Sequence, residues 1–264
     1  MARSIAGGLI NSGINAQNIA ASDPDAKRRE DLQNTLGIRA EQDNAAVAGD
    51  CDILVIAVKP QVMASVCQAL SSALNRSPLV ISIAAGIDCR SLNTWLDHRA
   101  AVVRCMPNTP ALIGEGASAL FATAEVSAAQ CKLAEQTIRA VGSVCWVEHE
   151  SQLDAVTAVS GSGPAYFFLV LEAMTEAGVK LGLEKQTAAD LAIQTAFGAA
   201  KLARESDLDL AQLRRAVTSP KGTTESAIAS FEKHQIRHIF MEAMQDCAAR
   251  SRELCLELGA KSTL

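Results

Sequence analysis

The order of strand and helix patterns along the chain constrains its fold more than any other sequence feature. Short apolar runs typical of strands recur through the first 150 residues, and helical stretches separate most of them. The runs 53–58 and 79–83 are almost continuously apolar, which is typical of parallel strands covered on both faces. Strands that alternate with helices predict an α/β fold with a doubly wound parallel sheet.

The pattern changes near residue 150. Before that point we expect strands at 18–22, 53–58, 79–83, 101–106, 117–123 and 144–147, and helices at 2–11, 26–35, 62–74, 91–96 and 127–141. After it no convincing strand pattern remains, and we expect helices at 152–159, 164–181, 187–205, 209–217, 223–233 and 237–258. The sequence therefore predicts an α/β domain over 1–150, followed by an all-α C-terminal domain over 151–264.

Composition narrows the class of protein. Apolar residues make up 49% of the chain and aromatic residues only 3%, so the core is expected to consist mainly of Ala, Leu, Ile and Val. The net charge of -5 argues against a nucleic-acid-binding surface. No apolar run is expected to approach the length of a membrane span, and no signal peptide is recognisable. These features predict a cytoplasmic protein that binds neither nucleic acid nor membrane.

The cysteines give a similar indication. The chain has 8 of them, scattered and without a C-x-x-C pair, and many lie within apolar runs. We interpret them as reduced, buried, small hydrophobic residues, and we expect no metal site.

The chain opens with a helical stretch, whereas a doubly wound sheet normally opens with a strand and a glycine-rich turn. Residues 1–10 are typical of the helix that follows such a turn. One interpretation is a naturally shorter N-terminus. We favour a chain that lacks its first strand, because Ile19 to Ser22 would otherwise lie at an open sheet edge.

Residues 217–226 combine small hydroxyl residues with Pro220 and Gly222 just before an apolar-periodic run. This pattern predicts a loop that leads into a helix, with Thr223 or Thr224 as the N-cap. Free N–H groups at a helix N-terminus bind anions, and the helix dipole adds to the attraction. A small carboxylate ligand would fit here, and the alternative is an ordinary capped helix.

Several short motifs occur in a fixed order along the chain. They are the opening Met1-Ala2, then Ala57-Val58-Lys59-Pro60, Ala84-Ala85-Gly86, Arg104-Cys105-Met106-Pro107-Asn108-Thr109-Pro110, Ser160-Gly161-Ser162-Gly163-Pro164-Ala165-Tyr166 and Thr218-Ser219-Pro220-Lys221-Gly222-Thr223-Thr224. In this order and spacing the chain resembles the pyrroline-5-carboxylate reductases from end to end. That family carries a strand and a Gly-x-Gly-type turn before the position of Met1. Their absence here puts pyrophosphate binding in doubt.

The resemblance implies an enzyme of proline synthesis with a Rossmann-like first domain. Its substrate would be the cyclic imine 1-pyrroline-5-carboxylate, which hydride transfer from NADPH converts to L-proline, with NADH possible as the donor. Residues 1–150 would bind the dinucleotide, and residues 151–264 would hold the substrate and form a homo-oligomer. Helices at 164–181 and 187–205 are apolar on more than one face, which also indicates an oligomer.

Ligands of open α/β sheets bind beyond the carboxyl ends of the strands, which places several residues at the cofactor site. Together with the resemblance, this predicts the following cofactor-binding residues: Ser22, Asp23, Asn44, Ala57, Val58, Lys59, Pro60, Ala84, Ala85 and Asn108. Asp23 would disfavour a 2′-phosphate, and Lys27, Arg28 and Arg29 are expected to offset it. From the sequence alone, Lys59 is equally well interpreted as a solvated loop lysine.

The same reasoning places the substrate. We expect its carboxylate on backbone N–H groups between Ser219 and Thr223, with Ser219, Gly222, Thr223 and Thr224 as the binding residues. Thr224 is the predicted catalytic residue, because its hydroxyl would hydrogen-bond the ring nitrogen. A protonated imine is already electrophilic, so positioning would supply most of the catalysis.

Two other classes stay open at this point. A 3-hydroxyacid-type dehydrogenase of similar architecture would carry a catalytic lysine on the helix after its glycine motif. Here the helix beginning at Ala165 has no lysine before Lys180, which argues against that class. The other alternative is an impaired, truncated homologue that acts as an oligomeric binding protein.

Overall fold

The computed structural model describes residues 1–259 and divides them into two compact units. One unit is Met1–Ser162 together with the chain from Asp246 onward, and the other is Gly163–Gln245. This division differs from the predicted boundary after residue 150, because the following helical turns and the end of the last helix pack with the first unit. The last five residues of the predicted 151–264 domain lie outside the described part.

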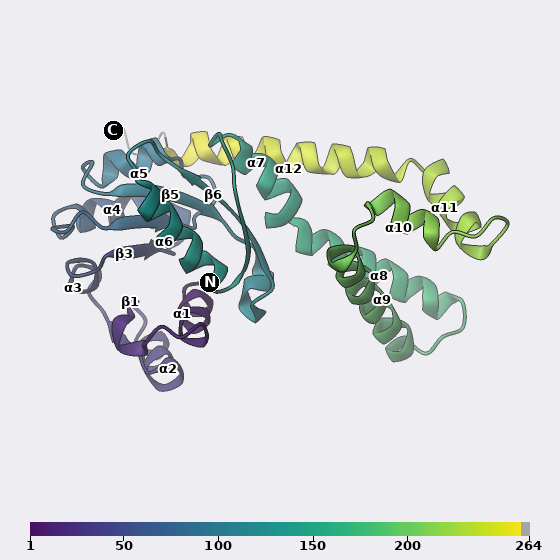
Figure 1. Cartoon of the computed structure of the whole chain (residues 1–264), viewed down its shortest axis with the longest axis horizontal. Coiled ribbons are helices and arrows are strands. Elements are labelled where there is room, and N and C mark those ends of the chain that lie inside the picture. The colour runs from purple at the N-terminus through teal and green to yellow at the C-terminus, as the bar shows by residue number, and fades with distance from the viewer. Residues whose placement is uncertain (260–264) are drawn as a thin grey trace. The chain divides into compact units, whose positions relative to one another are not determined.

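The first unit contains a five-stranded sheet (Figure 1). Its strands, in spatial order, are β3 (Ile53–Ile56), β4 (Leu79–Ser82), β5 (Ala101–Met106), β6 (Gly116–Ala122) and β7 (Gly142–Trp146). Every neighbouring pair is parallel except β5 and β6, which are antiparallel. A short loop with the 3₁₀ turn Thr109–Ile113 joins these two strands, and an antiparallel pair needs no crossover helix. The predicted parallel-dominated sheet is confirmed with this one exception.

A separate two-stranded parallel sheet holds β1 (Ala20–Ser22) and β2 (Arg39–Glu41). Within the described residues β1 pairs only with β2, and β3 pairs only with β4, so each has one edge without a strand. Neither β2 nor the helix α3 (Asn44–Ala48) was predicted from the sequence. Both elements are too short to show a periodic apolar pattern.

Helices cover both faces of the larger sheet. They are α1 (Ala2–Asn11), α4 (Met63–Ser71), α5 (Cys89–Trp95) and α6 (Ala128–Arg139), whereas α2 (Ala26–Leu36) packs on β1 and β2. On β4, Val80 belongs to the core cluster shared with α4 and α5, whereas Leu79 and Ile81 belong to the cluster shared with α1 and α6. This alternation follows from the two-residue period of a strand. It confirms the doubly wound arrangement.

The cysteines of the described chain are all free, but only three are buried. Burial raises the pKa of the Cys67 thiol to about 12. Burial also raises the pKa of the Cys105 thiol to about 12, so both act as small apolar groups at neutral pH. Cys145 is exposed, and for this residue the interpretation as a buried hydrophobe is wrong.

The second unit is helical in its described residues. It contains α8 (Gly163–Lys180), α9 (Lys185–Glu205), α10 (Leu210–Ala216), α11 (Thr223–Lys233) and the start of α12 (Ile236–Gly259). These bounds lie within two residues of the predicted helices. A Cβ added at Gly178 would lie 3.0 Å from the Cβ of Ala188, so α8 and α9 pack closely through small residues.

The chain enters α8 through α7 (Gln152–Val156) and a π-helical turn at Thr157–Gly161. The helical segment Gln152–Lys180 is long and apolar enough to cross a membrane by length and composition, since an 18-residue window within it has a mean hydropathy of 1.2. The expectation that no stretch approaches such a length is therefore wrong. Only 17% of its apolar window is buried within this chain, which leaves much of that surface for a partner.

Candidate functional site

The carboxyl ends of β3, β4 and β5 bring most of the predicted cofactor residues to one edge of the sheet. These strands are parallel neighbours, with Ile56 beside Ser82 and Ser82 beside Arg104. The segment Ala57–Pro60 therefore follows β3 at the same edge at which Ala84 and Ala85 follow β4. A flat ligand could lie close to the backbone there, because the side chains after β4 are single methyl groups.

Ser22 and Asn44 lie together although 22 positions separate them. The Ser22 hydroxyl at the end of β1 donates to Oδ1 of Asn44 at 2.8 Å. Asn44 begins α3, whose N-cap Asp43 accepts from the N–H of Ala45. The structure thus places two neutral polar side chains of the predicted cofactor set in contact, both of them partly exposed.

Two of the three predicted basic neighbours of Asp23 lie beside it. Arg28 Nη1 is 3.6 Å from the Asp23 carboxylate, and Arg29 Nη1 donates to the Asp23 carbonyl at 2.7 Å. Lys27 makes no ion pair with Asp23 within the described chain. Of these basic residues, Arg28 faces the Asp23 carboxylate itself, whereas Arg29 holds the backbone of the loop.

Asn108 follows β5 at the same edge, but its side chain is buried and its amide is engaged by the protein. Its Nδ2 donates to the Ser160 carbonyl at 3.0 Å, and its Oδ1 accepts from the Ala117 N–H at 2.9 Å. The side chain thus ties the start of β6 to the Ser160 motif. Asn108 remains a predicted cofactor residue by its position, although these two hydrogen bonds show that it also holds the loop.

The Ser160–Tyr166 motif brings a glycine against the strand end. A Cβ at Gly161 would lie 2.5 Å from the Met106 Cε, whereas a Cβ at Gly163 would meet nothing within 4 Å. Gly161 therefore permits a close approach to the end of β5.

A partly buried polar cluster near this edge escaped the sequence analysis. Oε1 of Glu150 accepts from the backbone N–H of Cys89 at 2.7 Å and from Arg104 Nη1 at 2.7 Å. The side chains of Arg104 and Glu150 are 13% and 28% exposed. The carboxylate therefore joins the first turn of α5 to β5. Nothing in the local sequence marks the pair, because its members are 46 positions apart.

The last helix, α12, packs onto the loop that follows β4. Gly86 has φ +70°, and a Cβ there would lie 3.2 Å from the Cβ of Leu254. Ser251 Oγ, on the same helix, donates to Oδ1 of Asp154 at 2.7 Å. The position of the Ala84–Gly86 loop thus depends on contacts with the C-terminal half of α12.

We expect Gly86→Ala to lower the free energy of unfolding by about 1–3 kcal/mol, through a positive φ and crowding against α12. Gly114→Ala is the matched control, because Gly114 has φ +78° and a Cβ there would meet nothing within 4 Å. Chemical denaturation of both variants separates the two causes. Equal losses would show that the contact with Leu254 contributes nothing.

The predicted substrate loop lies in the second unit and leads into α11 as expected. Its N-cap is Gly222 and no side chain caps the helix, so the predicted capping by Thr223 or Thr224 is wrong. Thr223 and Thr224 lie one and two positions after the N-cap, inside the first turn. Lys221 has φ 59°, and its N–H donates to Oε2 of Glu225 at 2.7 Å.

The first turn of α11 has hydrogen-bond donors that no group of the helix accepts from. The N–H of Gly222 donates to Ser219 O, and Glu225 takes the N–H of Lys221. The N–H groups of Thr223 and Thr224 begin the helix and have no acceptor within it. The hydroxyls of both threonines make no hydrogen bond in the described chain. This start of a helix can therefore bind a small anion beside two hydroxyl groups.

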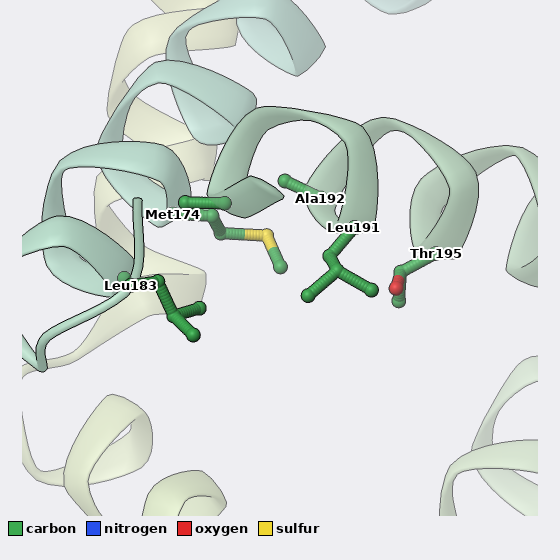
Figure 2. A pocket seen from close by; sticks show the side chains of 7 residues that line it. Met174, Leu183, Leu191, Ala192 and Thr195 are labelled. Carbon is green, nitrogen blue, oxygen red and sulfur yellow. The ribbon is translucent and has the colours of Figure 1, made fainter. Parts of the chain in front are cut away.

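Two surface hollows lie away from the predicted residues. One, of about 150 Å³, lies between α8 and α9 and is mainly apolar (Figure 2). Met174, Leu183 and Leu191 line it together with Thr195. The other, of about 490 Å³, lies between α1, the Thr109–Ile113 turn and α6. Neither hollow includes a predicted cofactor- or substrate-binding residue.

Comparison with known proteins gives the family. The model described as "Pyrroline-5-carboxylate reductase dimerisation" matches residues 150–254, and "NADP oxidoreductase coenzyme F420-dependent" matches residues 1–86. The chain is 52% identical to the pyrroline-5-carboxylate reductase of Pseudomonas aeruginosa over 98% of its own length and 95% of that protein.

Solved structures agree with the sequence relatives. The structure of a pyrroline-5-carboxylate reductase from Coxiella burnetii has a TM-score of 0.92 at 41% identity, covering 96% of this chain and 94% of that one. The Plasmodium falciparum pyrroline carboxylate reductase with NADP bound has a TM-score of 0.84 at 30% identity, covering 96% of this chain and 93% of that one. By identity and coverage together, the chain belongs to the pyrroline-5-carboxylate reductase family.

Proposed function

We propose that the protein reduces 1-pyrroline-5-carboxylate to L-proline with NADPH, and that NADH can replace NADPH. The observation that carries the proposal is the 52% identity to a pyrroline-5-carboxylate reductase over 98% of the chain. The predicted fold, with small residues after β3 and β4 at one sheet edge, supports it. A cytoplasmic location belongs to the same proposal.

The first unit offers a surface that fits a dinucleotide. Small residues after β4 allow close approach, the Ser22–Asn44 pair offers neutral hydrogen-bonding groups, and no side chain caps α1. Met1, at the start of α1, packs on the same core cluster as Ile83 at the end of β4. When bound, the nicotinamide supplies the hydride that the imine carbon accepts.

The second unit offers the substrate residues. The N–H groups of Thr223 and Thr224 would bind the carboxylate of the imine, with Ser219 and Gly222 shaping the loop. The Thr224 hydroxyl oxygen would accept a hydrogen bond from the protonated ring nitrogen, or the hydroxyl would help to deliver its proton. Glu225 lies in the same turn and adds negative charge, which favours a protonated, cationic ring over a second anion.

The direct test is the absorbance of NADPH during incubation of the purified protein with 1-pyrroline-5-carboxylate. We expect oxidation of NADPH and formation of proline identified by chromatography. Faster turnover of a 3-hydroxy acid with the oxidised cofactor would favour the dehydrogenase alternative. Cofactor binding without turnover of either substrate would favour the impaired, oligomeric homologue.

The helical unit is the dimerisation region of the family model, and its surface fits that role. Phe167 on α8 and Phe197 on α9 are 67% and 62% exposed, and further large apolar side chains lie exposed along both helices. Exposed apolar surface of this extent marks an interface. The chain therefore forms a homo-oligomer through this unit.

Phe168 lies next to Phe167 on α8 and is also exposed. We expect Phe168→Glu to shift the assembly toward monomer at micromolar concentration. A buried charge without a partner opposes association, whereas the exposed side chain costs the isolated chain little. Light scattering measures the change. Gln68→Glu on the exposed surface of α4, in the first unit, is the control for one added negative charge. An unchanged mass for Phe168→Glu would exclude this part of α8 from the interface.

A further inference from the structure

The side chain of Asp23 is turned toward the start of α2. Its Oδ1 accepts from the backbone N–H of Asp25 at 2.9 Å, and its Oδ2 faces Arg28 Nη1 at 3.6 Å. The Asp23 side chain is only 25% exposed. An acidic residue that binds a ribose 2′-hydroxyl after this strand must present its carboxylate to the ligand. Here both oxygens already have partners in their own loop.

The backbone of this loop is held as well. The N–H of Asp23 donates to Glu41 O at 3.1 Å, which continues the pairing of β1 with β2. Arg29 Nη1 donates to the carbonyls of Asp23 and Pro24 at 2.7 and 3.0 Å. These bonds hold the loop in a conformation in which the carboxylate of Asp23 contacts Asp25 and Arg28 at the start of α2.

The Arg28 side chain is less tightly held than that of Asp23. Its side chain is 71% exposed, and its contacts with Asp23 and Asp25 are ion pairs of 3.6 and 3.7 Å, which are long for charged hydrogen bonds. Exposed pairs of this kind are weak and exchange readily with other anions. A guanidinium can bind two phosphate oxygens at once, which suits it to a monoester phosphate.

We propose that Arg28 recognises the 2′-phosphate of the dinucleotide, and that Asp23 is a structural residue of the β1–α2 loop that does not select against this phosphate. The inference rests on the proposed function and names the residue that sets its cofactor preference. Ser22 at the end of β1 and its hydrogen-bond partner Asn44 at the start of α3 are uncharged and do not repel the phosphate. The acidic residue after β1 is therefore no sign of NADH preference in this chain.

Isothermal calorimetry with 2′,5′-ADP and 5′-AMP tests the proposal without turnover. We expect the wild-type protein to bind 2′,5′-ADP more tightly than 5′-AMP. Arg28→Gln should weaken 2′,5′-ADP binding by about 10- to 100-fold and leave 5′-AMP binding within about twofold, since only a charged contact is lost. Lys27→Gln, which removes a neighbouring positive charge, should change both by less than about threefold.

Asp23→Asn is the second variant, and it keeps an oxygen acceptor for the N–H of Asp25. We expect it to leave the ratio of the two affinities within about threefold, and a thermal melt confirms that it folds. A tenfold rise in the ratio would show that Asp23 faces the ribose and would overturn the proposal. An unchanged ratio of the two affinities in Arg28→Gln would also overturn the proposal. That result would leave the proposed function intact, because imine reduction by the wild-type protein tests it separately.

Discussion

Replacing Thr224 with valine is expected to lower kcat by about 2- to 150-fold, the equivalent of losing one hydrogen bond of about 0.5–3 kcal/mol. Valine keeps the β-branched shape and the backbone N–H, so carboxylate binding should survive. NADPH affinity should change little, because the predicted cofactor residues lie in the other unit. Steady-state kinetics with varied imine and varied NADPH measure both effects.

The structure sharpens this test. Gly222 is the N-cap of α11, and the Thr224 hydroxyl caps nothing, so the loss of about 1 kcal/mol that a missing cap would cause is not expected. Thr223→Val is the matched control, since Thr223 is the preceding residue of the same turn. A lower melting temperature with unchanged kcat would make Thr224 a structural residue. An equal fall in kcat for both variants would remove its special role.

Replacing Glu150 with alanine is expected to lower the free energy of unfolding by about 2–4 kcal/mol. The change leaves the positive charge of Arg104 largely buried and unpaired, and it removes the acceptor of the Cys89 N–H. The loss is expected to be smaller than for a fully buried pair, because Glu150 is 28% exposed. Urea denaturation followed by circular dichroism gives the value.

Two further variants identify the cause. Asp97→Asn breaks the exposed Arg99–Asp97 pair and should cost less than about 1 kcal/mol. The double variant Arg104→Met with Glu150→Ala should recover part of the loss, because it removes the unpaired charge. If Glu150→Ala costs no more than Asp97→Asn, the Arg104–Glu150 pair contributes nothing to stability.

Long elements with a clear period were predictable from the sequence. The helices from α8 to α12 lie within two residues of the expected ranges, because their apolar patterns extend over several turns. The continuous apolar runs predicted β3 and β4, and strand ends at one sheet edge followed from parallel pairing. Short elements such as β2 and α3 were missed, because three to five residues carry no measurable period.

The sequence by itself determined the alternation of strands and helices, the helical second half and the motifs that identify the family. Only the tertiary structure decided the orientation of Asp23, the contact of Ser22 with Asn44 and the Arg104–Glu150 pair. It also placed the N-cap of α11 at Gly222 instead of at a threonine. The physical reason is range: periodicity and turn chemistry act between near neighbours, whereas Arg104 and Glu150 meet across 46 positions and only because β5 and the loop before α7 pack together.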